Sequence, residues 1–162
     1  MRLEKDFEEF IGLLNKHKVR YVVVGAYAVS FYARPRYTGD IDFLIEGTPG
    51  NSNRLLACLK EFGFGELGLR REDFEDPEMV VQLGYEPVRI DILSSLSGVE
   101  TKKALRSRVR GQFGKQRAWF ISLVDLIQSK RTTGRKQDEA DVELLEKIHR
   151  RRTKQGTSGR AR

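Results

Sequence analysis

Three aspartates in two short alternating segments are the residues best suited to carry chemistry. Asp40 and Asp42 lie two residues apart within residues 40–45, and Asp91 lies within residues 88–93. Residues two apart on a strand share a face, so we expect the acids to project together while the apolar residues enter the core. Adjacent carboxylates repel each other unless a cation lies between them. Oxygen ligands on rigid strands suit Mg²⁺ or Mn²⁺, so the three aspartates predict a divalent metal site.

Such a site suits phosphoryl transfer. Two divalent ions about 3.5–4 Å apart can clamp the attacking and leaving oxygens of the reaction. We expect Asp91 to accept the proton of an attacking hydroxyl, while Asp40 and Asp42 hold the metal that carries the triphosphate. Arg89 is expected on the same face as Asp91. The prediction fails if the carboxylate oxygens are scattered, or if a neighbouring basic side chain leaves no room for an ion.

A strand that ends in glycine lies just upstream and predicts a place for phosphates. Residues 21–24 are aromatic and β-branched, which is typical of a buried strand, and Gly25 permits a tight exit into a helix over residues 26–32. Backbone N–H groups at a helix start bind anions. Gly25 and Ala26 are therefore candidate nucleotide contacts, Ala26 through its backbone amide alone.

The run from residue 22 to residue 45, followed by a lone acid in a later strand, resembles the nucleotidyltransferase superfamily typified by DNA polymerase beta. It is most similar to the small bacterial branch that includes minimal nucleotidyltransferases and the AbiEii-type toxins of toxin–antitoxin pairs. The motif of that branch reads Gly-Gly-x-Ala, then His-Gly-x-x-Arg-x-Thr-x-Asp-x-Asp. Six positions match it, namely Gly25, Ala28, Arg36, Thr38, Asp40 and Asp42.

The C-terminal part extends the resemblance to about residues 22–145. In the same branch a helix lysine reaches the nucleotide phosphates, and Lys130 stands at that position, followed by Arg135, Asp138 and Asp141. Lys130 is equally compatible with a surface position on a helix. For the two later acids a structural role at a helix start is favoured, because negative charge there is stabilised by the helix dipole.

Arg36 and Thr38 also have two interpretations. Either they contact phosphate, or they fix the loop, Arg36 by pairing with a carboxylate and Thr38 by capping. The chain departs from the branch at three further positions. Ala26 replaces a residue that is often Ser or Gly, and Tyr32 and Ala33 replace His-Gly. Any role of that histidine is therefore absent or has moved to the Tyr32 hydroxyl.

The resemblance implies an α/β (α+β) nucleotidyltransferase fold, with a mixed, partly antiparallel sheet flanked by helices. It implies Mg²⁺-dependent (or Mn²⁺-dependent) transfer of a nucleoside monophosphate from an NTP such as ATP to a hydroxyl of tRNA, another RNA or a protein. The setting would be a toxin–antitoxin system with a cognate toxin or antitoxin as partner. The alternative is a non-catalytic nucleotidyltransferase-like module that binds nucleotide, RNA or a partner toxin, as the departures at Ala26 and Tyr32 suggest.

Length and composition bound the architecture. The chain has 162 residues, of which 39% are hydrophobic, enough for one core, so we expect a single domain over residues 1–149. There is no apolar run of membrane-spanning length, and the charged N-terminus argues against a signal peptide. A cytoplasmic protein without membrane contact is expected. Cys58, the one cysteine, has leucines around it at helical spacing and is predicted to be buried packing.

Basic charge is concentrated in two segments. Residues 150–162 hold six Lys or Arg and no acid, which leaves +1 of the net charge of +7 for the rest of the chain. We expect this segment to be a basic, disordered tail. The second segment, residues 102–117, contains seven Lys or Arg and no acid. It is interpreted either as a surface for a polyanionic acceptor or an acidic partner, or as an exposed helix and loop.

Hydrophobic periodicity and turn residues predict the remaining elements. We expect helices over residues 3–16, 51–62, 123–131 and 137–149, with Asn51 or Ser52 as the N-cap of the second. Strands are expected over residues 79–83 and 118–121, the first joined to the Asp91 strand by a hairpin turn. The connection over residues 94–116 is left without assigned elements.

Overall fold

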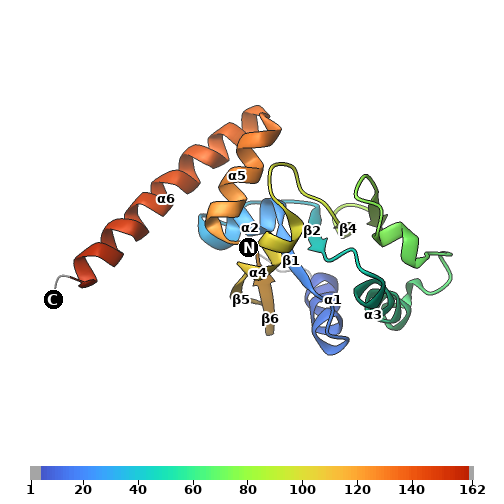
Figure 1. Cartoon of the computed structure of the whole chain (residues 1–162). Helices are drawn as coiled ribbons and strands as arrows, with labels where there is room; N and C mark the ends of the chain where they lie inside the picture. The colour runs from blue at the N-terminus through green and yellow to red at the C-terminus, as the bar shows by residue number, and fades with distance from the viewer. Residues whose placement is uncertain (1–4, 161–162) are drawn as a thin grey trace.

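A six-stranded mixed sheet runs through the molecule, with helices on both faces (Figure 1). The computed structural model describes residues 5–160, and side chains as far as residue 156. The sheet order is β3-β4-β2-β1-β6-β5. The pairs β4/β2 and β1/β6 are parallel, and the other three neighbouring pairs are antiparallel. The predicted α/β class with a mixed, partly antiparallel sheet is therefore confirmed.

Strands and helices are interspersed along the chain. The strands are β1 (Tyr21–Val24), β2 (Asp40–Ile45), β3 (Val80–Leu83), β4 (Arg89–Leu93), β5 (Val109–Phe113) and β6 (Gln116–Phe120). The helices are α1 (Lys5–Lys16), α2 (Gly25–Tyr32), α3 (Pro49–Leu59), α4 (Thr101–Arg106), α5 (Leu123–Thr133) and α6 (Lys136–Arg160), with short η1 (Lys60–Phe64) and η2 (Arg71–Phe74) after α3.

The sheet separates two apolar clusters, and successive side chains of β1 point alternately into one and the other. Tyr21 and Val23 belong to the cluster that contains α1 and α3 residues such as Phe10. Val22 and Val24 belong to the cluster formed with α2, α4, α5 and α6. Because every residue of β1 is buried, this strand is the central support of the site at its C-terminal end.

Cys58 lies in the first of these clusters, fully buried. Burial, and secondly the negative charge of Glu61, raises the pKa of its thiol to about 12. The thiol is therefore inert packing, as predicted. None of the helices within residues 5–160 combines the length and the apolar character that a membrane crossing requires.

Most predicted elements appear with shifts of a few residues at their ends, and three predictions differ in kind from the structure. The unassigned segment 94–116 contains α4 and β5, which were missed because both elements are short and Phe113 is the one buried residue of β5. The N-cap of α3 is Thr48 rather than Asn51 or Ser52, because Pro49 occupies the first helical turn and the Thr48 hydroxyl accepts from the Asn51 amide.

The segment predicted as a disordered tail differs from the structure as well. Helix α6 continues to Arg160, and only residues 161–162 of that segment lie outside the described chain. Arg, Lys and Gln are good helix formers, and no proline interrupts the run. The Arg152 guanidinium also lies over the Tyr32 ring, 5.3 Å from its centre, and this contact joins α6 to α2 at Arg152. In Figure 1 the end of α6 extends away from the sheet.

Candidate functional site

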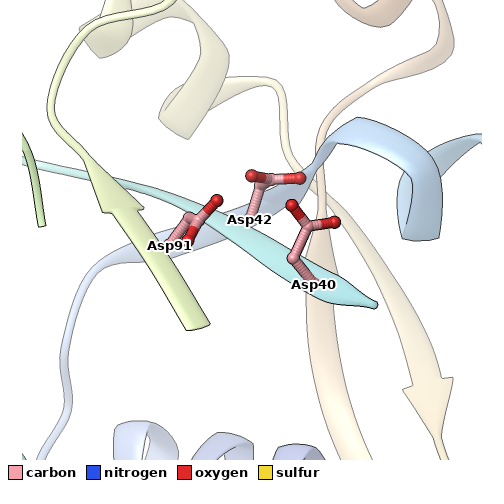
Figure 2. A group of neighbouring side chains, drawn as sticks. All are labelled: Asp40, Asp42 and Asp91. Atoms are coloured by element: carbon pink, nitrogen blue, oxygen red, sulfur yellow. The ribbon is translucent and has the colours of Figure 1, made fainter. Parts of the chain in front are cut away.

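The pairing of β2 with β4 brings the three aspartates together. Asp42 lies directly beside Asp91 in the parallel register, and Asp40 lies beside Arg89. One carboxylate oxygen from each aspartate lies within 4.8 Å of the other two. Figure 2 shows the three carboxylates on the same side of the two neighbouring strands. The expected convergence of Asp40, Asp42 and Asp91 is thus present in the structure.

Gly25 is required by the position of Asp42. Its φ is +69°, and a Cβ built on it would lie 2.3 Å from Asp42 Oδ2. Only glycine combines this backbone conformation with so close an approach. The Asp42 carboxylate therefore lies against the first residue of α2.

The start of α2 offers free backbone donors. Val24 is its N-cap and supplies no side-chain acceptor, and the first turn contains no acid. Ala26 is the second residue of the helix and is partly exposed. The first N–H groups of a helix have no partner within it, so this turn can receive an anion.

Asp42 differs from its two neighbours in its electrostatic environment. Burial, followed by the negative charges of Asp40 and Asp91, raises its pKa from the ordinary 3.8 to about 7. Arg89 and Lys130 oppose this rise but do not cancel it. Among the described residues, none donates a hydrogen bond to the Asp42 carboxylate or pairs with it at ion-pair distance. The Asp42 carboxylate therefore has no cationic partner at ion-pair distance among these residues to stabilise its ionised form.

Arg89 supplies part of the positive charge at the site. Its Nε and Nη2 donate to Asp91 Oδ1 and Oδ2 at 2.9 and 3.0 Å, and Nη2 also donates to Asp40 Oδ2 at 2.7 Å. The guanidinium therefore holds Asp40 and Asp91, but it leaves Asp42 to one side. Arg89 is thus a basic side chain next to the aspartates, and the predicted metal site depends on whether it leaves room for an ion.

The three carboxylates fit a divalent cation by the chemistry of their oxygen donors. Three carboxylates against one guanidinium leave an excess of negative charge, and the excess is greatest at Asp42, whose pKa is raised. Oxygen donors of this kind are those that Mg²⁺ and Mn²⁺ take. A divalent cation would share Asp40 and Asp91 with Arg89 or displace its guanidinium.

Lys130 lies on α5 and is held between two acids of α6. Its Nζ lies 3.0 Å from Asp138 Oδ1 and 3.0 Å from Asp141 Oδ2, and its side chain is only 11% exposed. The surface alternative for Lys130 is therefore wrong. Asp138 is lowered in pKa, because the hydrogen bonds from Thr133 and Lys130 outweigh the effect of burial.

Arg36 and Thr38 both make the contacts expected of loop-fixing residues. Arg36 Nη1 donates to Asp141 Oδ1 at 2.7 Å, which ties the α2–β2 loop to α6. Thr38 Oγ1 donates to Asp40 Oδ1 at 2.9 Å. Tyr32 is buried, and its hydroxyl donates to the Ile121 carbonyl at 2.6 Å. That hydroxyl is thus engaged in a structural hydrogen bond.

A cavity of about 250 Å³ connects Asp42 to Lys130. Its walls come from the end of β1, the start of α2, the loop after β4, and helices α5 and α6. The lining includes Val24, Gly25, Asp42, Leu93, Leu96, Ser97, Leu126, Ser129, Lys130, Thr133, Arg135 and Asp138. Asp42 lies at one side of this cavity, and Lys130 and Arg135 lie at the other together with Asp138, one of the two carboxylates that pair with Lys130.

Sequence reasoning did not give Arg89 or Thr133 a role at the site. The strand alternation that placed Asp91 also placed Arg89 on its face, so a signal existed for that contact. Thr133, the last residue of α5, donates to Asp138 Oδ2 at 2.6 Å across the short turn between α5 and α6. The sequence separation of these two residues does not by itself indicate the contact.

Comparisons with known proteins identify the family and the fold. Residues 3–158 match the model of the family described as "Nucleotidyl transferase of unknown function (DUF2204)". Among solved structures, the chain is similar to a crystal structure of the lincosamide antibiotic adenylyltransferase LnuA with lincomycin bound. The TM-score is 0.58 at 14% sequence identity, over 90% of this chain and 97% of that one. This likeness shows a shared fold. No curated protein matches the chain.

Proposed function

The chain belongs to this nucleotidyl transferase family, and we propose that it moves a nucleoside monophosphate from an NTP to a hydroxyl group and releases pyrophosphate. The observation that carries the proposal is the group of three carboxylates within 4.8 Å of one another, beside Gly25 and a cavity that Lys130 lines. The fold shared with an adenylyltransferase supports ATP as the donor.

Asp40, Asp42 and Asp91 would hold Mg²⁺ or Mn²⁺. A bound divalent ion supplies charge neutralisation to the phosphates and to the leaving pyrophosphate. The acceptor oxygen forms a bond to the α-phosphorus, the bond from the α-phosphorus to pyrophosphate breaks, and the acceptor proton passes to a carboxylate oxygen of Asp91. Both Asp91 oxygens accept from Arg89, and each keeps a lone pair for this proton.

The phosphates would lie between two kinds of donor. The backbone N–H groups of Gly25 and Ala26 lie at one side of the cavity mouth, where α2 begins. Lys130 and Arg135 line the other side. Arg36 and Thr38 act indirectly in this proposal, because Arg36 fixes Asp141 beside Lys130 and Thr38 orients Asp40.

The acceptor is proposed from three classes. A hydroxyl of tRNA or another RNA, or of a protein, agrees with the resemblance to the AbiEii-type branch, which also carries the toxin–antitoxin setting. A small-molecule hydroxyl is added by the structural neighbour, an adenylyltransferase of lincosamide antibiotics. The branch, the setting and the cytoplasmic location stay predictions.

A second candidate function rests on Arg89. Because its guanidinium already pairs with Asp40 and Asp91, the site is partly neutralised without a metal ion. This observation favours a non-catalytic module that binds nucleotide, RNA or a partner toxin. In that case NTP binding would be independent of Mg²⁺.

The test is incubation with each of the four α-labelled NTPs, with Mg²⁺ or Mn²⁺, and with one acceptor class at a time. We expect label to enter an acceptor with the wild type and to be lost with Asp91→Asn. Asp6→Asn, an exposed carboxylate in the first turn of α1, is the matched control and should transfer label normally. Absence of labelling with every NTP and acceptor, in a protein shown to be folded, would contradict the proposal.

A further inference from the structure

A second hollow lies at the opposite end of β1 from the aspartates. Residues just before β1 form one side of it and the β5–β6 hairpin forms the other, around a cavity of about 360 Å³. This volume falls within the range of about 300–1,000 Å³ that is usual for small-molecule sites. The lining includes Lys18, Arg20, Arg108, Arg110, Arg117 and Trp119.

The hairpin presents its cations on one face. Arg110 lies directly opposite Trp119 in the antiparallel register, Arg117 is two residues from Trp119 along β6, and Arg108 lies just before β5, two residues from Arg110. The guanidinium carbons of Arg108 and Arg110 lie 4.4 and 5.3 Å from the centre of the indole ring. Cation–π contact orders these side chains before any ligand arrives.

The positive charge of the cavity is largely uncompensated. Arg20 pairs with Glu46 at 3.1 Å. For the part of the chain that the structure describes, no ion pair reaches Lys18, Arg108, Arg110 or Arg117.

Arg108 shows the imbalance most clearly. Its Nη1 is buried and has no hydrogen-bond partner among the described residues. Its pKa is lowered, first by burial and then by the positive charge of Arg20, against the attraction of Glu46 and Tyr21. A buried guanidinium N–H without an acceptor is costly unless a ligand completes its hydrogen bonds.

The backbone at the rim supports the same conclusion. Lys18 has φ +57°, the only positive value at a non-glycine position among the described residues. This conformation after a helix end ordinarily favours glycine or asparagine. Here a lysine occupies it and adds its charge to the rim of the cavity.

We propose that this cavity is a binding site for a phosphate ester, taken either as a free nucleotide or as one nucleotide unit of an RNA strand. Several arginine forks around one hollow match the oxygens of a phosphate, and four unpaired cations favour a ligand with more than one negative charge. The site shares no lining residue with the cavity beside the aspartates. It therefore adds an anchoring point to the molecule and does not extend the first site.

The sequence provides a direct reporter, because Trp119 is the only tryptophan. Its fluorescence would be titrated, in EDTA so that metal-dependent binding at the aspartates is silent, with pyrophosphate, ATP, AMP and a short single-stranded RNA. We expect a saturable change. In Arg108→Gln or Arg117→Gln the affinity should fall about tenfold, the loss expected for one charge-assisted hydrogen bond.

Two controls make the result specific. Arg106→Gln removes the same charge from exposed α4, outside the cavity, and should leave the titration unchanged. Asp42→Asn should also leave it unchanged, so that failure of the proposed catalysis and failure of this site are separable. Circular dichroism would verify folding, and Arg117 is exposed, so its substitution does not disturb the core.

The arms of the experiment identify the source of the phosphate. Two results together would identify an RNA unit. RNA would bind more tightly than ATP, and the slope of log affinity against log salt concentration would be smaller by about one in Arg117→Gln than in the wild type. Comparable binding of ATP and RNA would identify a free nucleotide. The proposal is overturned if no phosphate compound changes the fluorescence, if the Arg106→Gln control loses as much affinity as Arg108→Gln, or if an acidic peptide binds in place of the phosphate compounds.

Discussion

Replacing Asp42 with asparagine tests the electrostatics of the site in one step. The substitution keeps the shape of the side chain and removes its ability to ionise. Burial and the charges of Asp40 and Asp91 raise the pKa of Asp42 to about 7 in the folded protein, against 3.8 in a fully solvated chain. The wild type should therefore lose stability as the pH rises, and Asp42→Asn should lose less.

The sign and size follow from proton linkage. Between pH 5 and the folded pKa of about 7, the folded state keeps a proton on Asp42 that the unfolded state has released. Stability then falls as pH rises, by 1.36 kcal/mol per pH unit, or about 3 kcal/mol over this interval, and is level above it. The variant has no such loss, so its stability relative to wild type should increase by about 3 kcal/mol between pH 5 and pH 8.5.

Urea unfolding in EDTA, followed by circular dichroism at the two pH values, measures this difference directly. Titrating groups away from this site affect both proteins equally and cancel in the comparison. Asp6→Asn, at an exposed carboxylate, should show no pH-dependent difference from wild type. If the stability of Asp42→Asn relative to wild type is the same at pH 5 and pH 8.5, or decreases, the reasoning about this carboxylate is wrong.

Three further substitutions address the surroundings of this carboxylate. Gly25→Ala should destabilise the protein by about 2 kcal/mol more in thermal or urea unfolding than Gly68→Ala, because both glycines have positive φ but only Gly25 lies against Asp42; equal losses would refute the contact. Lys130→Met should cost about 3 kcal/mol in urea unfolding, because it leaves two buried carboxylates without their shared cation, and a loss below about 1 kcal/mol would show that the pair is unimportant. Arg89→Met should tighten Mn²⁺ binding, measured by electron paramagnetic resonance, about tenfold, because the guanidinium that pairs with two of the three carboxylates is gone; unchanged or weaker binding would mean that it does not compete with the ion.

The aspartate arrangement was predictable because it depends on local rules. Strand alternation sets Asp40, Asp42 and Asp91 on one face, and the parallel β2/β4 pairing then determines which of them are neighbours. The need for glycine at residue 25 was also predictable from the sequence. Its physical reason, the close approach of Asp42, could be seen only in the folded structure.

The contacts that hold the nucleotide side of the site were not predictable in the same way. Arg36 and Asp141 are 105 residues apart, and they meet only because α6 packs beside α2 and α5. Strand β5 was missed for a different reason. Its five residues give only a weak hydrophobic alternation, because Gly111 has no side chain and Phe113 alone is buried, and its position depends on pairing with β6.

The basic segments show how charge alone misleads. The run over residues 102–117 is divided by the fold, with Arg106 exposed on α4 and Arg108, Arg110 and Arg117 gathered around Trp119. The C-terminal run was predicted to be disordered from its composition, but it is helical as far as Arg160. Composition therefore indicated positive charge correctly but not where the charge converges.

Calorimetric titration of the protein with NTP, with and without Mg²⁺, tests the central claim most directly. If the three carboxylates gather a cation beside the triphosphate, NTP should bind tightly only with Mg²⁺, and this dependence should disappear in Asp40→Asn. Binding of NTP that is equally strong without Mg²⁺ and unchanged in Asp40→Asn would contradict the claim and leave the binding-module alternative in its place.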